Sequence, residues 1–288
     1  MKLSRIAIGS CLALAVVTVA HADKAAWTQP QQPFRIYGNT YYVGTHGLTA
    51  ILIASSDGLV LLDGTLPQNA AMVEANIKAL GFQLHDVKRI LNSHAHSDHA
   101  GGIAAIARDS GARVMASETG AKELQLGGHY PDDPQDGDAP TYPPVSPVEV
   151  VADNGEVRLG DVAVTAHYTP GHTPGSTSWT WQSCEGKRCL NMVYADSISA
   201  LTAGSFRYSD PAHPERVSNY RHGLAVIASL PCDILMVPHP DQIDFLERAA
   251  RRKAGTPDPL VDPAACRTYA QAGTRSLDDR LAKERVAK

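Results

Sequence analysis

Short apolar runs and helical spacings succeed one another along the chain in two comparable blocks. In the first block, apolar runs bounded by Gly, Asn and Asp predict strands at 34–37, 40–44, 49–55, 58–63, 87–91 and 112–116. Apolar residues on one helical face predict helices at 69–80 and 100–108. The second block predicts strands at 149–151, near 157, and at 162–168, 176–181, 190–195 and 234–237, with helices at 214–230 and in the last fifty residues. This repeated order predicts an α/β protein, an αββα sandwich in which two mixed β-sheets pack face to face with helices outside.

The first 22 residues have the features of a secretory signal peptide. Lys2 and Arg5 precede an apolar run at 6–20, and Ala20-His21-Ala22 has the form of a cleavage site. The apolar run is short for a transmembrane helix, and no other stretch approaches the roughly 20 residues that one needs. We therefore expect a signal peptide at 1–22, a periplasmic protein with no membrane attachment after cleavage, and a single domain over 23–288.

The charge of the mature chain restricts its partners. Cleavage would leave 266 residues with 24 basic and 30 acidic side chains, a net charge of −6. This balance argues against nucleic acid or an anionic membrane surface as a partner. We expect a monomer that acts on a small molecule.

Export would place four cysteines in an oxidising compartment, where disulfides form. Four cysteines allow three pairings. The polar, Gly-containing residues between Cys184 and Cys189 predict a hairpin, so these two cysteines should pair locally and leave Cys232 to pair with Cys266. Free buried thiols are the alternative.

Residues 92–102 concentrate the chemistry of the chain in the pattern His94-x-His96-x-Asp98-His99. In an extended turn, His94 and His96 point the same way, while Asp98 and His99 point elsewhere and can serve a second ion. Imidazole nitrogens and carboxylate oxygens are ligands of zinc, and the small flanking residues leave room for ions. The motif follows the strand at 87–91, the usual place for a site in an α/β sheet. The alternative is a polar surface loop with clustered histidines.

Two further turns each hold a histidine at a strand end. His172 stands between two Pro-Gly pairs after the strand at 162–168, and His239 stands between two prolines after the strand at 234–237. Rigid turns of this kind suit preorganised ligands, although either histidine alone could be a solvated turn residue. The six residues predict two ligand sets: His94, His96 and His172, and Asp98, His99 and His239. Three protein ligands leave one position of a zinc ion open for catalysis, and two neighbouring ions suit hydrolysis.

The chain resembles the metallo-β-lactamase superfamily and, within it, the subclass B3 β-lactamases. The superfamily motif is His94-x-His96-x-Asp98-His99 with His172 and His239. The subclass resemblance extends through most of the mature chain, in Gly44-Thr45-x-Gly47-Leu48-Thr49-Ala50, Leu61-Leu62-Asp63-Gly64, Gly171-His172-Thr173-Pro174-Gly175-Ser176-Thr177 and Tyr194-Ala195-Asp196-Ser197-x-Ser199-Ala200. Subclasses B1 and B2 have a zinc-binding Cys where Ser197 stands, which favours B3. The resemblance implies two zinc ions per chain and a disulfide between Cys232 and Cys266.

The resemblance also implies an activity and roles for further residues. It implies zinc-dependent hydrolysis of the β-lactam ring of penicillins, cephalosporins and carbapenems by a metal-bound hydroxide, which gives antibiotic resistance. Asp98 would bind the second ion and orient the hydroxide, and Ser197 and Ser199 would contact the substrate carboxylate. Trp27 and the loop at 127–138 would overhang the groove. Asp63 is a candidate partner for a ligand imidazole, with a turn cap as the alternative.

Two other functions are compatible with six metal ligands. Asp196 lies near the position where glyoxalase II-like thioesterases place a metal-bridging Asp, so thioester, lactone or phosphoester hydrolysis is the alternative enzyme activity. A secreted zinc-storage protein is the alternative that is not an enzyme. Storage does not require a site divided among three strand-end turns. Ser197-x-Ser199 and the signal peptide favour the β-lactamase.

Overall fold

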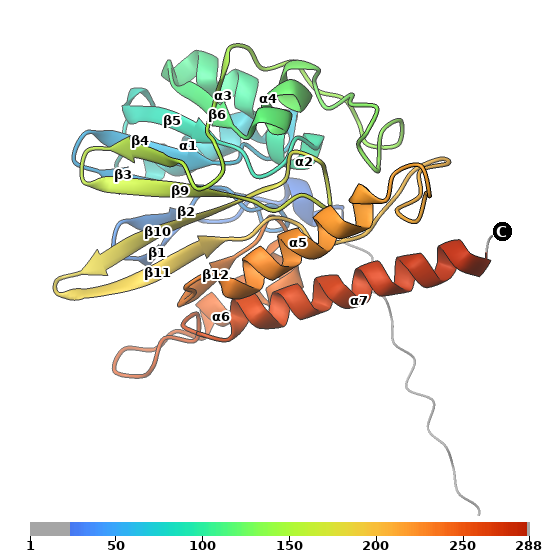
Figure 1. Cartoon of the computed structure of the whole chain (residues 1–288). Coiled ribbons are helices and arrows are strands. Elements are labelled where there is room, and N and C mark those ends of the chain that lie inside the picture. The colour runs from blue at the N-terminus through green and yellow to red at the C-terminus, as the bar shows by residue number, and fades with distance from the viewer. Residues whose placement is uncertain (1–23, 287–288) are drawn as a thin grey trace, which may run out of the picture.

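The protein folds as two β-sheets packed face to face with helices on the outer faces (Figure 1). The computed structural model describes residues 24–286, so the predicted signal peptide at 1–22 lies outside the described residues. Within 24–286, none of the helices combines the length and apolar character needed to cross a membrane. The predicted αββα arrangement is confirmed.

The first sheet has seven strands in the order β1-β2-β3-β4-β5-β6-β7. They are β1 Phe34–Tyr37, β2 Thr40–Tyr42, β3 Ile51–Ser55, β4 Gly58–Leu62, β5 Val87–Leu91, β6 Arg113–Ala116 and β7 Val148–Val150. Strands β1 to β4 pair antiparallel, and β4 to β7 pair parallel. Parallel neighbours need crossover connections, which contain α1 Ala70–Ala79, α2 Ser97–Ala100, α3 Ile103–Ser110 and α4 Glu118–Gln125.

Two features of the first sheet differ from the sequence prediction. Helix α4 was not predicted, and β7 was grouped with the second block of strands. In the structure α4 provides the crossover from β6, and β7 pairs in parallel with β6. Ser117 begins α4 as a helix cap, because its Oγ accepts the Gly120 N–H at 3.1 Å.

The second sheet has five strands in the order β12-β11-β10-β9-β8. They are β8 Glu156–Leu159, β9 Val162–Tyr168, β10 Thr177–Glu185, β11 Arg188–Tyr194 and β12 Ile234–Met236. β11 pairs in parallel with β12, and α5 Glu215–Ser229 lies in the connection between these two strands. The other neighbours pair antiparallel. The chain ends with α6 Phe245–Ala250 and α7 Ala265–Val286, and α7 runs beside α5 (Figure 1). Short 3-10 helices lie at Ala26–Thr28, Pro67–Asn69, Leu84–Asp86 and Pro240–Ile243.

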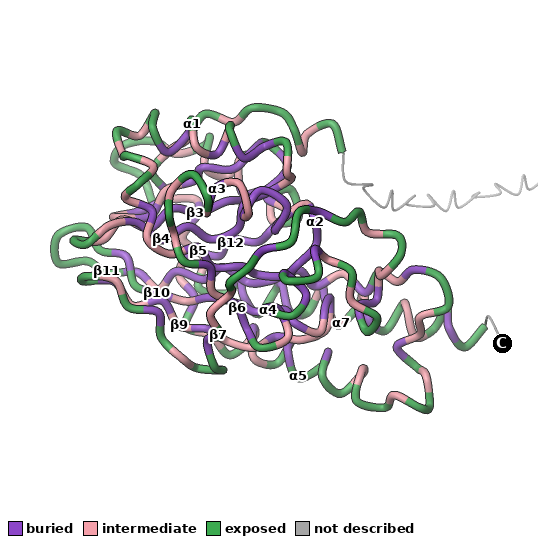
Figure 2. Tube along the Cα trace, turned by 90° about the horizontal axis from the view of Figure 1, so that it is seen from above, coloured by how far each residue is buried: buried purple, intermediate pink, exposed green. Residues whose placement is uncertain are grey.

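Strand β4 shows why its apolar run is continuous. Val60 and Leu62 face the core between the sheets, and Leu59 and Leu61 face the core under α1 and α3. Successive strand residues point to opposite faces, so a strand covered on both faces needs apolar residues throughout. A third core lies under α5 and α7. Figure 2 shows the buried positions concentrated in the interior of the molecule.

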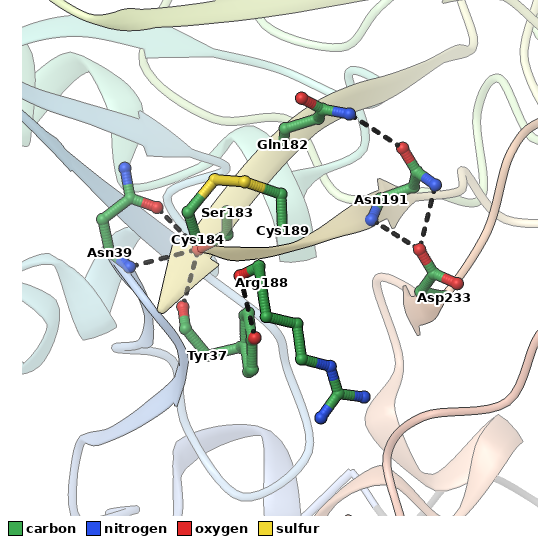
Figure 3. Close-up of a disulfide and its surroundings, with 9 residues drawn as sticks. All are labelled: Tyr37, Asn39, Gln182, Ser183, Cys184, Arg188, Cys189, Asn191 and Asp233. Carbon is green, nitrogen blue, oxygen red and sulfur yellow. Dashed lines mark hydrogen bonds between the residues drawn. A yellow bond between two sulfur atoms is a disulfide. The ribbon is translucent and has the colours of Figure 1, made fainter. Parts of the chain in front are cut away.

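Both expected disulfides are present. Cys184 and Cys189 face each other across the β10–β11 hairpin, and Cys232 pairs with Cys266 at the start of α7. Beside the hairpin disulfide, Tyr37 Oη donates a hydrogen bond to the Arg188 carbonyl oxygen at 3.1 Å (Figure 3). The hairpin tip is thus joined to the first sheet, and the second disulfide ties α7 to the chain just before β12.

Candidate metal centre

Three turns bring the six predicted ligands together. His94 and His96 follow β5, and Asp98 and His99 lie in the short helix α2. His172 occupies the turn between β9 and β10, and His239 follows β12. The ligands therefore come from the ends of strands in both sheets.

The first set consists of His94, His96 and His172, all of them buried. One ligand atom from each lies within 4.8 Å of the others. Their ring centroids are 4.7–4.9 Å apart and their planes cross at 80–89°, so the rings present edges to one another. The buried Nε2 of His94 has no hydrogen-bond partner among the described residues. A buried, unpartnered nitrogen beside two other imidazoles fits a bound metal ion.

The second set is tighter. Asp98 Oδ2 lies 3.3 Å from His99 Nε2 and 3.5 Å from His239 Nε2, and the two nitrogens are 3.3 Å apart. A tetrahedral zinc ion with ligands about 2.0–2.1 Å away spaces neighbouring ligand atoms about 3.3–3.4 Å apart. Asp98 and His99 also lie within 4.8 Å of a ligand atom of His94, so the two sets adjoin. The geometry of the second set fits zinc.

Each imidazole of the first set has a polar partner at one of its ring nitrogens. His94 Nδ1 lies 2.7 Å from Asp196 Oδ1, and both side chains are buried. His96 Nε2 lies 3.0 and 3.2 Å from the two oxygens of Asp133. His172 Nδ1 donates a hydrogen bond to the Ser199 carbonyl oxygen at 2.8 Å. Such partners select the tautomer and orient the other ring nitrogen toward a metal.

Asp133 is a residue of the candidate site that the sequence analysis missed. It lies in the loop at 127–138, which was expected to overhang the groove, and its side chain is buried. The same loop contains Asp132, Asp136 and Asp138, and nothing in the sequence distinguishes Asp133 from them. Through this contact with His96, Asp133 joins the long loop to the candidate metal site.

Asp196 occupies a position that bears on the thioesterase alternative. Its Oδ1 contacts Nδ1 of His94, the ring nitrogen opposite the unpartnered Nε2. Burial raises its pKa above the usual range. Asp196 therefore orients a ligand of the first set through Oδ1, whereas its buried Oδ2 has no hydrogen-bond partner among the described residues.

The two serines expected to contact substrate differ in their surroundings. The hydroxyl of Ser197 is buried, with no hydrogen-bond partner within the part of the chain that the structure describes. The hydroxyl of Ser199 lies 3.2 Å from His172 Nδ1, beside the bond from the Ser199 carbonyl. Ser197 thus has the free hydroxyl, whereas Ser199 supports the His172 ring.

Asp63 supports the turn before the metal motif. The sequence analysis offered two roles for it, partner of a ligand imidazole or cap of a turn, and its hydrogen bonds go to the turn. Its carboxylate accepts hydrogen bonds from Asn92 Nδ2 at 2.9 Å, from Ser93 N at 2.8 Å and Ser93 Oγ at 2.6 Å, and from Tyr194 Oη at 2.8 Å. These bonds link the end of β4 to the residues just before His94. Asp63 is therefore a support for the turn.

The N-terminal arm lies against the second set. The ring of Trp27 is 5.5 Å from the ring of His239, centroid to centroid. The arm is fixed there because Asn69 Nδ2 donates a hydrogen bond to the Trp27 carbonyl oxygen at 2.8 Å. Trp27 therefore borders the site.

Electrostatics favours the metal-binding form of the ligand carboxylate and of three of the five imidazoles, whereas Asp133 and Asp98 outweigh burial and raise the pKa of His96 and of His99, respectively. Burial lowers the pKa of His94 well below its ordinary value and lowers those of His172 and His239 to about 4. Burial alone would raise the pKa of Asp98, but His99 and His239 hold it well below the usual range. Neutral imidazoles and an ionised carboxylate are the forms that bind metals.

A buried carboxyl group beside the His172 turn gives a pH-dependent prediction. Glu123 accepts the Gly175 N–H at 3.1 Å, and burial, followed by the nearby Asp133, raises its pKa from 4.5 to about 8. Between pH 4.5 and about 8 the unfolded state loses the Glu123 proton while the folded state keeps it. The stability present below pH 4.5 is therefore lost as the pH rises to about 8. Glu123→Gln keeps a hydrogen-bond acceptor but has no buried charge. Its free energy of unfolding should therefore exceed that of the parent protein, and the excess should be larger at pH 9 than at pH 5.

Urea unfolding of the chelator-treated protein at these two pH values tests this prediction. The control is Glu118→Gln on the exposed side of the same helix, for which we expect no such pH dependence. An identical effect of Glu123→Gln at both pH values would contradict the assignment.

Comparison with known proteins agrees with this geometry. The family model of the metallo-β-lactamase superfamily matches residues 43–185. A hydroxyacylglutathione hydrolase from Anaeromyxobacter dehalogenans is 33% identical over 172 residues, which cover 59% of this chain and 53% of that protein. The chain thus spans little more than half the length of the curated relatives that it matches.

Solved structures match over nearly their whole length. Rm3 metallo-β-lactamase is 49% identical with a TM-score of 0.87, and the match covers 91% of this chain and 97% of that protein. MEM-A1, a subclass B3 metallo-β-lactamase from a soil metagenome library, is 47% identical with a TM-score of 0.88, and the match covers 91% of this chain and 100% of that protein. MIM-1 from Novosphingobium pentaromativorans is 41% identical with a TM-score of 0.87 and coverages of 95% and 98%. With such likeness in sequence and structure, the chain belongs to the metallo-β-lactamase superfamily and, within it, to the subclass B3 enzymes.

Proposed function

We propose that the protein is a periplasmic, monomeric di-zinc β-lactamase that opens the β-lactam ring of penicillins, cephalosporins and carbapenems and so gives antibiotic resistance. One observation carries the proposal. Two adjoining sets of three candidate ligands lie together in a chain that matches the whole of a subclass B3 enzyme over 91% of its own length. When bound, the two ions supply water of lowered pKa as a nucleophile and positive charge for the lactam oxygen and nitrogen.

The residues of this chain divide the remaining work. One ion would be held by His94, His96 and His172, and the other by Asp98, His99 and His239. Asp133 and Asp196 keep two of these imidazoles oriented, so the ligands need little rearrangement during the reaction. Asp98, the carboxylate among the ligands, can also accept a hydrogen bond from the attacking water and orient it. The mechanism needs no nucleophilic side chain and therefore no acyl-enzyme.

Ser197 and Ser199 are proposed to contact the carboxylate common to bicyclic β-lactams, directly or through water, and the Ser197 hydroxyl is the one without a hydrogen-bond partner among the described residues. A hydrogen bond to a charged group contributes about 1.5–3 kcal/mol, part of which water recovers, so Ser197→Ala should raise KM about 3- to 10-fold. The same variant should change kcat less than about two-fold, because the lost contact is made in the ground state as well as in the transition state. Steady-state kinetics with a carbapenem measures both constants.

Ser199→Ala is the matched comparison for this prediction. Its hydroxyl lies beside His172, so this variant should lower kcat as well as raise KM. A Ser197→Ala variant with reduced kcat and unchanged KM would show that Ser197 does not bind the substrate carboxylate.

Thioester hydrolysis is the second candidate function, because one relative is a hydroxyacylglutathione hydrolase. The alternative required Asp196 as a metal bridge, and the contact of its Oδ1 with His94 gives the carboxylate another role, that of orienting an imidazole. The deciding experiment assays the zinc-loaded enzyme with a penicillin, a carbapenem and a glutathione thioester side by side. We expect both β-lactams to be opened, chelator to stop the reaction, and inhibitors of serine β-lactamases to have no effect. Turnover of the thioester alone would overturn the β-lactamase assignment.

A further inference from the structure

We propose that Glu284, near the end of the C-terminal helix α7, is a positioning residue for the metal centre. It acts through Tyr208 on the turn that carries His172, and the proposal rests on the metal site described above. Glu284 is distant in sequence from every proposed ligand, and its side chain contacts none of the six.

Helix α7 holds the segment that follows β11. Ser276, Arg280 and Glu284 are spaced four residues apart, which places them along one face of the helix. Ser276 Oγ accepts the Ala200 N–H at 3.0 Å, and Arg280 Nε donates to the Ala200 carbonyl oxygen at 3.0 Å. The polar stripe therefore binds the backbone of the segment, with Ser276 and Arg280 half-buried and Glu284 buried.

Glu284 makes the last contact of this stripe. Its side chain is buried, at 5% exposure, although it lies close to the end of the helix. One carboxylate oxygen accepts the Tyr208 N–H at 3.0 Å, and the other accepts the Ser209 N–H at 2.8 Å. Hydrogen bonds to an ionised acceptor are among the stronger ones in proteins, so this pair fixes the backbone at Tyr208.

Tyr208 transmits that position to the His172 turn. Its Oη donates a hydrogen bond to the Gly171 carbonyl oxygen at 2.9 Å, and its ring meets that of Tyr220 edge-on at 5.4 Å. The Tyr220 ring covers Gly171 so closely that a Cβ atom there would lie 2.8–3.1 Å from ring atoms. The backbone preceding His172 is thus held from both sides.

The bond to Gly171 bears directly on the ligand. The Gly171 carbonyl belongs to the peptide unit that joins Gly171 to His172, and this unit is planar. Fixing the plane of the peptide fixes the His172 N–Cα bond, so that only rotation about this bond remains to set the direction in which the side chain leaves the backbone. The contacts Glu284–Tyr208–Gly171 therefore set the approach of the imidazole, while Ser199 sets its rotation.

The test compares zinc affinity in Glu284→Gln, Tyr208→Phe, the double variant and a matched control. Asp279→Asn makes the same acid-to-amide change on an exposed position of α7. Chelator competition measures zinc affinity, and urea unfolding of the apoprotein measures stability separately. We expect either single variant to weaken zinc binding at the first site about 3- to 10-fold. The double variant should add little because both changes break one chain of contacts, and Asp279→Asn should change nothing.

The second site makes the test specific, because Glu284→Gln should leave its zinc affinity unchanged. The proposal fails if zinc affinity at the first site is unchanged in both single variants, if their effects add, or if the second site is weakened equally. If Glu284→Gln does not fold, Tyr208→Phe decides, since it removes one hydroxyl and keeps the ring. A parent protein that binds no zinc would overturn the metal site as well, whereas normal zinc binding in every variant would overturn this inference alone.

Discussion

His172→Ala is expected to reduce kcat/KM for β-lactams by at least about a thousand-fold and to remove one of two bound zinc ions. The change deletes one of three nitrogens in the first ligand set, which lie within 4.8 Å of one another. A thousand-fold loss corresponds to about 4 kcal/mol of transition-state stabilisation, which is within what a catalytic ion supplies. Metal analysis and steady-state kinetics on the purified variant measure the two effects.

Two comparisons make this result specific. His239→Ala should instead release the ion of the second set, since it removes one of three ligand atoms that lie 3.3–3.5 Å apart. His222→Ala changes an exposed histidine of α5 and should leave both metal content and activity unchanged. Full zinc content and activity in His172→Ala would remove that residue from the site.

Asp63→Ala is expected to lower the free energy of unfolding by about 3–5 kcal/mol, because it leaves several buried donors without their charged acceptor. Asp63 is fully buried and accepts four hydrogen bonds, from the side chains of Asn92, Ser93 and Tyr194 and from the Ser93 N–H. These donors lie too deep for water to replace the carboxylate. Urea or guanidinium unfolding at neutral pH measures the loss.

Smaller changes in the same network provide the controls. Tyr194→Phe removes one of the four donors and should cost about 1 kcal/mol, while Asp57→Ala, in the exposed hairpin before β4, should cost little. If Asp63→Ala cost no more than Tyr194→Phe, the carboxylate would not be the centre of this network.

The parts of the fold that have a local signal could be predicted. The apolar run of β4 indicates a strand buried on both faces, and the Pro-Gly pairs around His172 indicate a rigid turn after a strand. Helix α4 has little such signal, because it spans eight residues, contains Gly120 and buries Glu123, a type of residue that is usually exposed. The sheet to which β7 belongs depends on its pairing with β6, which no local pattern specifies.

The candidate site divides in the same way. The six candidate ligands can be recognised in the sequence because each lies in a distinctive turn that follows a strand. Asp133 and Glu284 could not, because each acts through a tertiary contact, with His96 in one case and with the backbone of Tyr208 in the other. An acidic residue in a loop or near a helix end has many ordinary explanations when its neighbours in space are unknown.

The origin of the ligands in both sheets links metal supply to the survival of the protein. Four ligands follow β5 of the first sheet, whereas His172 and His239 follow strands of the second, so each zinc ion would cross-link the two halves of the fold. A ligand that binds only the folded state stabilises it by about 2.7 kcal/mol at a hundred times its dissociation constant. At the proposed periplasmic location, zinc depletion should therefore expose the chain to proteases, and the proposed resistance should fall through the amount of enzyme as well as through its turnover.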